Sequence, residues 1–267
     1  MLVNEYYIAR HSSYILYSFE FIANVFVFFI VIYLYKTRKD RKSIWVFLLT
    51  GLAHSTLELI AQGLGIRVIE GAYLFNISIG YPYICFIMGF FEGGIVCLAG
   101  YHFVKYLTDK NRFSFKFFLS LSIILFILIF VGGILARLQI GFDNTERSIT
   151  RRIIFNPLNI LFEVLFYVIP ILYFLFYPKV KKEDRITLFY FYLGIILFTM
   201  FFVIPNHILG IRFIEIKKDD YYETASLIEQ IVVMYGYNIP FESAGFLIQY
   251  YILIYHFNLI QFSRNND

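Results

Sequence analysis

Seven stretches of about twenty mainly apolar residues, joined by short polar segments, limit what this chain can fold into more than any other feature. A bilayer core about 30 Å thick needs roughly 20 such residues in a helix. Hydrophobic residues make up 60% of the chain and charged residues 16%, whereas soluble domains have about 45–50% and about 25%. The sequence therefore predicts an all-α polytopic membrane protein, a seven-transmembrane-helix bundle. The expected spans are 14–35, 43–63, 81–106, 117–136, 157–177, 186–209 and 241–262.

The segments between these spans are too short for a soluble domain, so residues 1–267 are expected to form one integral membrane domain. The first span is too long for a signal-peptide core and is followed at once by the basic run KTRKDRK, which indicates a retained anchor. Segments 64–80 and 224–240 are apolar but interrupted, and are expected to lie in the interface or to re-enter the bundle as a lid. Segment 137–156 is more polar and is expected to be solvated.

The distribution of Lys and Arg predicts the orientation of the bundle. Of the 23 basic residues, 14 lie in the loops after spans one, three and five and at the C-terminus, and 9 lie on the other side. The positive-inside rule then places the N-terminus outside and the C-terminus in the cytoplasm. The net charge of +4 is spread over short loops and forms no basic face, so no nucleic-acid partner is predicted.

Small residues in the third span predict close helix packing. Gly89, Gly93 and Cys97 recur at four-residue spacing, and small residues at this spacing let two helices approach closely. We expect this span to be the central helix of the bundle. The same residues could instead form a dimer face, so a homo-oligomer remains an alternative.

Ionisable and amide side chains inside the expected spans lie at similar depths. A charged side chain near the bilayer centre costs about 2.5–3.5 kcal/mol on insertion scales, so it persists when it faces the bundle interior and is paired or functional. His102 and His256 lie near the inner ends and are expected to be interfacial. The others predict one polar cavity open toward the outer side: His54 and Glu92 near mid-membrane, and Glu20, Glu58, Glu163, Asn206, His207 and Glu242 in the outer half.

The strongest local signal is the pair His54 and Glu58, which are four residues apart and therefore share one face of a helix. Such a carboxylate can orient the imidazole. Glu92 would add a second carboxylate, and carboxylates that share a dry site can keep one of them protonated and able to act as a general acid. The alternative is that His54 and Glu58 form a buried pair that only fixes packing.

Several kinds of chemistry lack their signatures. The last span contains no lysine for a retinal Schiff base, and the chain has no GxSxG, HExxH, CxxC or P-loop motif. His54, Glu58, Glu92 and His207 include types of ligand that zinc or iron binds. Because no HxxxH pair is present, we predict neither a metal nor another cofactor.

The stretch DRKSIWVFLLTGLAHSTLELI resembles the emopamil-binding-protein family of sterol isomerases, which carry the same His-x-x-x-Glu step after a basic loop. The resemblance implies that Glu92 joins His54 and Glu58 in an acid–base group. Glu163, seven residues before Pro170, stands where the family has an asparagine, and Phe166 stands where it has a tryptophan.

Two further resemblances rest on the second and third spans. The segment YLYKTRKDRKS followed by Glu58 is similar to the membrane-bound terpene cyclases of meroterpenoid pathways, whose acidic residue in the seventh helix would correspond to Glu242. The step His54-Ser55-Thr56 and the pair Glu92-Gly93 are similar to the transmembrane protein 45 family. The sterol isomerases and the terpene cyclases both protonate isoprenoid-derived substrates inside a helical bundle.

The sequence therefore favours an intramembrane acid–base enzyme, an isomerase or a cyclase, that acts on an isoprenoid or sterol-like lipid. Its expected partners are membrane lipids and a hydrophobic small-molecule substrate. The alternatives are a proton-coupled transporter or small-ligand-binding protein using the same cluster, and a scaffold; no internal two-fold sequence symmetry is apparent in support of transport. The expected catalytic residues are Glu58, His54 and Glu92, and the expected substrate-binding residues are Glu163, Asn206, His207, Glu242 and Phe166.

Overall fold

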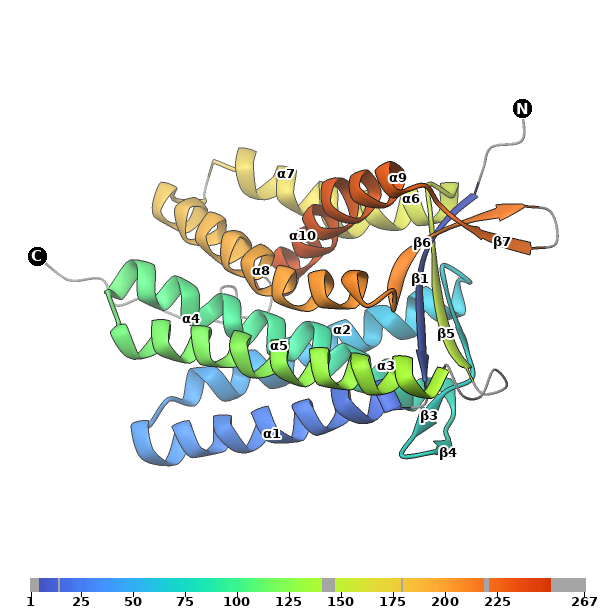
Figure 1. Cartoon of the computed structure of the whole chain (residues 1–267). Coiled ribbons are helices and arrows are strands. Elements are labelled where there is room, and N and C mark those ends of the chain that lie inside the picture. Colours follow the sequence, from blue (N-terminus) through green and yellow to red (C-terminus); the bar gives the residue numbers. More distant parts are fainter. Residues whose placement is uncertain (1–4, 14, 141–146, 179, 219–220, 251–267) are drawn as a thin grey trace, which may run out of the picture.

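A computed structural model describes residues 5–13, 15–140, 147–178, 180–218 and 221–250. The helices run side by side as a bundle, and a set of strands crosses one end of it (Figure 1). Five helices of the described chain are long and apolar enough to span a membrane: the rods built on α1, α2, α3–α4, α5 and α8.

The described helical segments join end to end into seven rods, three of which contain a π-helical turn. These turns, η1, η2 and η3, interrupt the third, fifth and seventh rods. Residues 251–262 of the expected last span lie outside the described residues. The rods are α1 (Ile15–Arg38), α2 (Arg41–Gly63), α3–η1–α4 (Tyr81–Gly89, Phe90–Ile95, Val96–Asp109), α5 (Arg112–Ile140), α6–η2–α7 (Pro157–Glu163, Val164–Val168, Ile169–Phe176), α8 (Lys182–Ile208) and α9–η3–α10 (Leu227–Ile231, Val232–Asn238, Ile239–Tyr250).

A five-stranded antiparallel sheet covers the end of the bundle where the N-terminal strand lies (Figure 1). The expectation of an all-α fold is wrong in this respect. The strand order is β2-β5-β1-β6-β7, and a separate hairpin follows β2. The strands are β1 (Glu5–Ser13), β2 (Arg67–Glu70), β5 (Arg147–Ile154), β6 (Arg212–Lys218) and β7 (Tyr221–Thr224), and the hairpin is β3 (Tyr73–Leu74) with β4 (Ile77–Ser78).

The sheet also corrects the expectations for two of the three long outer segments. Segment 64–80 contains β2 and the hairpin, and the solvated loop expected over 137–156 contains β5, which pairs with both β1 and β2. Segment 224–240 is largely helical and continues into α10. Within β6 the residues Ile214-Glu215-Ile216-Lys217 alternate apolar and charged side chains, a short strand signal that the search for long apolar helices passes over.

The described chain divides into two units with the same order of elements, joined by α5. The first unit is β1, α1, α2, β2 and α3–η1–α4; the second is β5, α6–η2–α7, α8, β6 and α9–η3–α10. The strand order β2-β5-β1-β6 reads the same from both ends when β1 is exchanged with β5 and β2 with β6. The two units are therefore related by an approximate two-fold arrangement.

Short sequence matches lie at corresponding places in the two units. Residues 64–70 read LGIRVIE and residues 209–215 read LGIRFIE, each directly after a helix and leading into a strand of the sheet, β2 or β6. The last rod of each unit also carries a match: FEGG at 91–94 in α3–η1–α4 and FESA at 241–244 in α9–η3–α10. The absence of internal symmetry inferred from sequence is thus wrong. The matches are short and are separated by helices whose sequences differ between the two units.

The LGIR segments end their helices with the same backbone geometry. Gly65 and Gly210 have φ of +70° and +65°, a left-handed conformation that glycine adopts without strain. The amide of Ile66 donates to the carbonyl of Ala61 over 2.9 Å, and that of Ile211 to the carbonyl of Asn206 over 2.8 Å. These bonds satisfy carbonyls that the last helical turn leaves free, and turn the chain into the sheet.

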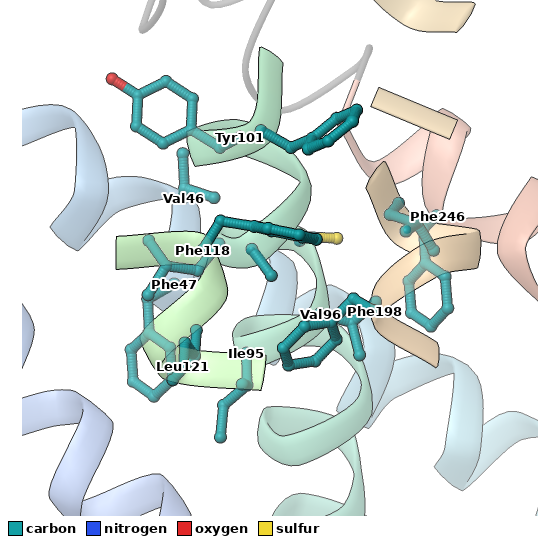
Figure 2. Packing of buried hydrophobic residues seen from close by; sticks show 14 of the residues in the cluster. Val46, Phe47, Ile95, Val96, Tyr101, Phe118, Leu121, Phe198 and Phe246 are labelled. Atoms are coloured by element: carbon teal, nitrogen blue, oxygen red, sulfur yellow. The ribbon is translucent and has the colours of Figure 1, made fainter. Parts of the chain in front are cut away.

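The rod α3–η1–α4 is the central helix, as the small residues predict. In its most apolar stretch 78% of residues are buried, against 33–44% in the other four long helices. Figure 2 shows the apolar core around it, where Val46, Ile95 and Phe118 belong to three different rods. Gly89 and Gly93 face α2 of the same chain, so this spacing serves packing within the monomer.

Replacing Gly89 by Ala is expected to destabilise the protein by about 1–3 kcal/mol, because overpacking a tight contact shifts the backbone. The added methyl group would collide with the backbone and the hydroxyl of Ser55 on α2. Thermal unfolding in detergent measures the change. Gly63→Ala is the matched control, because no neighbouring atom lies within 4 Å of the added carbon. Equal unfolding temperatures for the two variants would contradict the prediction.

Candidate functional site

Four arginines project from one face of the sheet into the bundle. In the sheet register Arg67 lies opposite Arg152, and Arg10 lies opposite Arg212. Residue Ile8 of β1 also lies opposite Arg152, so both pairs are on the same face. Charged groups withdrawn from water need partners, and here the helices supply glutamates. This row of arginines is absent from the sequence-based site.

The first unit surrounds its two arginines with three carboxylates. Arg10 Nη1 lies 2.7 Å from Glu20 Oε1, and its Nη2 lies 2.8 Å from Glu92 Oε1. Arg67 Nε lies 2.9 Å from Glu58 Oε2, and its Nη1 lies 3.9 Å from Glu92 Oε2. Burial disfavours the charged guanidinium groups, but these carboxylates outweigh it and raise the pKa of both arginines. We call this group the first clamp.

The second unit repeats the arrangement around one carboxylate. Glu242 Oε1 lies 2.6 Å from Nη1 of Arg152, and Glu242 Oε2 lies 3.1 Å from Nη2 of Arg212. Arg152 also donates from Nη2 to Asn238 Oδ1 over 2.6 Å. Burial lowers the pKa of Arg212, and Glu242 only partly offsets this effect. We call Arg152, Arg212 and Glu242 the second clamp.

His54 lies beside the carboxylates of the first clamp. Its Nε2 is 3.5 Å from Glu58 Oε1 and 3.7 Å from Glu92 Oε2, so the pairing expected from the four-residue spacing is present. Gln249 Nε2 lies 2.9 Å from the other ring nitrogen, Nδ1, and Phe246 stacks on the ring with centroids 4.9 Å apart. With the amide nitrogen assigned as donor to Nδ1, the neutral imidazole carries its proton on Nε2, facing both carboxylates.

A cavity of about 50 Å³ joins His54 and both clamps to an apolar region between α4, α5, α8 and α10. Because a water needs about 10–15 Å³ of such volume, the cavity has room for a few atoms of a ligand or a few waters. Its polar end holds His54, Glu58, Glu92, Glu242, Arg67, Arg152 and Arg212. Its apolar end includes Val96, Leu125, Ile129, Phe198 and Phe201, and the same helices add Ser122 and Thr199. Phe202 and Phe246 also line the cavity and lie against Arg212 and His54.

The structure brings together His54, Glu58, Glu92 and Glu242 of the expected site residues, but leaves four others outside the cavity lining. Glu163 accepts from Asn159 and is bonded to Tyr237. Phe166 packs on Phe162 with centroids 4.7 Å apart. These contacts lie beside α6, outside the cavity. The sequence did not reveal this, because helical spacing alone does not tell which side of that rod faces the site.

Asn206 and His207 are also engaged elsewhere. The side chain of Asn206 donates from Nδ2 to the main-chain carbonyl of Phe202. The main-chain carbonyl of Asn206 accepts from the amide of Ile211 in the turn that ends α8. His207 pairs with Tyr235 over 2.7 Å and with Gln230 over 3.1 Å. Both residues therefore shape the junction between α8 and the sheet.

The two histidines expected at the inner interface have different outcomes. His102 is fully buried, with Nε2 3.1 Å from the hydroxyl of Ser43 and Nδ1 3.4 Å from that of Ser114. His102 therefore takes its polar partners from two neighbouring helices and lies outside the lining of the cavity, and its interfacial depth stays a prediction. His256 lies outside the described residues.

His54, Glu58 and Glu92 could also supply ligands to a metal ion, since one donor atom from each lies within 4.8 Å of the others. Arg67 and Arg10 already contact these carboxylates. Two neighbouring guanidinium groups reduce the attraction of the cluster for a cation. The fourth ligand considered from sequence, His207, is bonded to Tyr235 and Gln230 instead.

Compared with known protein families, curated proteins and solved structures, the chain shows no significant match. The function must therefore be argued from the site itself. Its defining arrangement is His54 between Glu58 and Glu92, in a cavity lined by the ion-paired residues of the two clamps and by apolar side chains.

Proposed function

We propose that this protein is an intramembrane acid–base enzyme, of isomerase or cyclase type, that acts on an isoprenoid or sterol-like lipid. The observation that carries the proposal is the position of His54, with its Nε2 less than 4 Å from Glu58 and from Glu92 at the polar end of the cavity. A proton donor and acceptor this close can exchange a proton through one imidazole.

In the proposed reaction Glu58 gives its proton to a double bond of the substrate, which leaves a carbocation and a carboxylate. Glu92 then takes a proton from a carbon next to the cationic centre, which forms the new double bond. His54 returns that proton from Glu92 to Glu58, so the enzyme ends as it began. The aromatic faces of Phe91, Phe202 and other rings of the lining stabilise the cation.

The apolar end of the cavity supports entry from the lipid phase. Phe201 lines the cavity and is 38% exposed on the outside of α8, where its ring meets that of Phe126 on α5 at 6.4 Å between centroids. A substrate passing between these rings would reach His54 with only its reacting end inside. The rest of its chain would stay in the bilayer.

The sheet supports the seven-span topology with the N-terminus outside and the C-terminus in the cytoplasm. Four of the nine basic residues counted for the outer side are the arginines of the two clamps. Because glutamates neutralise their charge, they weigh less against the positive-inside rule. The far end of the bundle carries Lys and Arg at its helix ends, among them Lys36 and Arg38 in the last turn of α1.

Single cysteines at the two ends of the bundle test this orientation. We expect Glu223→Cys, on the exposed strand β7, to react with a membrane-impermeant maleimide in intact cells, and Asp109→Cys to react only after permeabilisation. The native Cys85 and Cys97 are fully buried and should give little background. The reverse pattern of labelling would overturn the proposed orientation.

The enzymatic proposal is tested by incubating the purified protein in proteoliposomes with a panel of isoprenoid and sterol lipids and analysing the products by mass spectrometry. We expect a product of unchanged mass and altered double-bond position or ring count, with deuterium incorporated from heavy water. Lipids recovered unchanged and free of deuterium across the panel would count against acid–base catalysis.

The two similar units give one specific reason to keep transport as a second candidate. Parallel repeats related by an axis along the membrane normal occur in transporters, whose sites lie at the interface between repeats. Here the clamps of both units meet at one cavity. Accumulation of a chemically unchanged ligand in the same proteoliposomes, driven by a pH gradient, would favour transport over catalysis.

A further inference from the structure

The two clamps are equivalent in position but not in charge. Matching LGIR with LGIR makes Arg67 equivalent to Arg212, and matching FEGG with FESA makes Glu92 equivalent to Glu242. The sheet completes the relation, because Arg67 faces Arg152 across β2 and β5 just as Arg212 faces Arg10 across β6 and β1. Each glutamate contacts both arginines of its own unit.

The sequence matches also show where the two units differ. In the alignment of the LGIR segments, His54 corresponds to Thr199 and Glu58 corresponds to Val203. The first clamp therefore holds three carboxylates against two guanidinium groups, while the second has Glu242 alone against two. One side of the cavity carries the acid–base group, and the other has one carboxylate for two guanidinium groups.

Two buried donors of the second clamp lack a partner. Within the part of the chain that the structure describes, Nε of Arg152 and Nε of Arg212 are both buried without a hydrogen-bond acceptor. The side chain of Arg212 is only 6% exposed, and both arginines line the cavity. Burying a charge without full pairing is costly, so a ligand that supplies negative oxygen atoms at this place would be stabilised.

We infer that Arg152 and Arg212 form a head-group subsite, which binds the anionic head, a phosphate or a carboxylate, of an amphipathic lipid. The lipid tail passes out through the apolar end of the same cavity, between α5 and α8, into the bilayer. This inference rests on the proposed function and adds the substrate class to it. A lipid anchored in this way presents the carbons near its head to His54 and Glu58 on the opposite side.

Equilibrium binding in detergent tests the subsite without any reaction. The probes are a saturated branched-chain phosphate, carboxylate and alcohol of equal length, so that no double bond can react, together with inorganic phosphate. We expect calorimetry to show roughly tenfold tighter binding of the anionic lipids than of the alcohol, as for a hydrogen bond to a charged group. Inorganic phosphate, which lacks a tail, should bind more weakly than the lipid phosphate.

Three variants separate this role from a structural one. Arg212→Met should abolish the preference for anions, and Arg151→Met, on the opposite face of the sheet, should keep it. Glu242→Gln should strengthen the preference, because it removes the carboxylate that competes with the ligand; this gain stays measurable if Arg212→Met fails to fold. Equal affinity of the wild type for all three lipids would overturn the subsite.

The outcomes also separate this inference from the proposed function. A preference for anions that depends on Arg212, in a protein that converts no unsaturated lipid, would uphold the subsite and refute the acid–base reaction. Turnover of unsaturated lipids with equal affinity for anionic and neutral heads would uphold the reaction and refute the subsite. A preference for one anion over the other would support the subsite and identify the head group.

Discussion

Replacing Glu58 by Gln is expected to lower the turnover of an isoprenoid lipid at least about a hundredfold while the protein remains folded. General acid–base catalysis contributes about 10²- to 10⁴-fold, and an amide has no acidic proton to give. The amide keeps the shape of the carboxylate beside Arg67 and His54. Product formation and the unfolding temperature of the same preparation together measure the effect.

Glu163→Gln is the matched control for this variant. Glu163 is buried to a similar degree, with 7% exposed against 5% for Glu58, and it pairs with Asn159 and Tyr237 outside the cavity lining. We expect its activity to stay near that of the wild type. Full activity of Glu58→Gln, or an equal loss in both variants, would remove Glu58 from the mechanism.

Replacing Glu92 by Ala is expected to destabilise the protein by about 3–5 kcal/mol, the usual effect of removing one partner of a buried ion pair. Glu92 contacts Arg10 at 2.8 Å and also lies within 4 Å of Arg67 and His54. Its loss leaves Arg10 with Glu20 alone in the first clamp. Thermal unfolding in detergent measures the change.

Glu70→Ala tests whether burial of the network is the cause. Glu70 also pairs with a sheet arginine, Arg151, at 3.2 Å, but its side chain is 56% exposed. Exposed pairs contribute about 0–1 kcal/mol, so this variant should unfold close to the wild type. If Glu92→Ala were as stable as Glu70→Ala, the first clamp would contribute little to the fold.

The helical part of the fold was accessible from sequence because apolar length is a local property. The expected span 43–63 corresponds to α2, Arg41–Gly63, and the expected span 81–106 corresponds to the rod Tyr81–Asp109. The proximity of His54 and Glu58 could also be predicted from sequence, since residues four apart share one face of a helix. The small residues of the third span similarly identified the central helix.

The sheet and its arginines were not recognised, although part of the signal was present. The alternation in IEIK of β6 and the repeated LGIR segments are visible in the sequence once the strands are known. Each arginine lies in a different strand, and the strands are far apart along the chain. A search based on charges inside apolar spans therefore placed these residues in loops.

The sequence alone determined the apolar helices and the positions of the acidic and imidazole groups along them. Only the tertiary structure decided which of these groups share a cavity: it joined Glu242 to Arg152 and Arg212, and left Glu163 and His207 outside. The physical reason is that hydrophobicity and helical period act over neighbouring residues. The partner of a buried charge depends instead on strand register and on the side of each helix that packing turns inward.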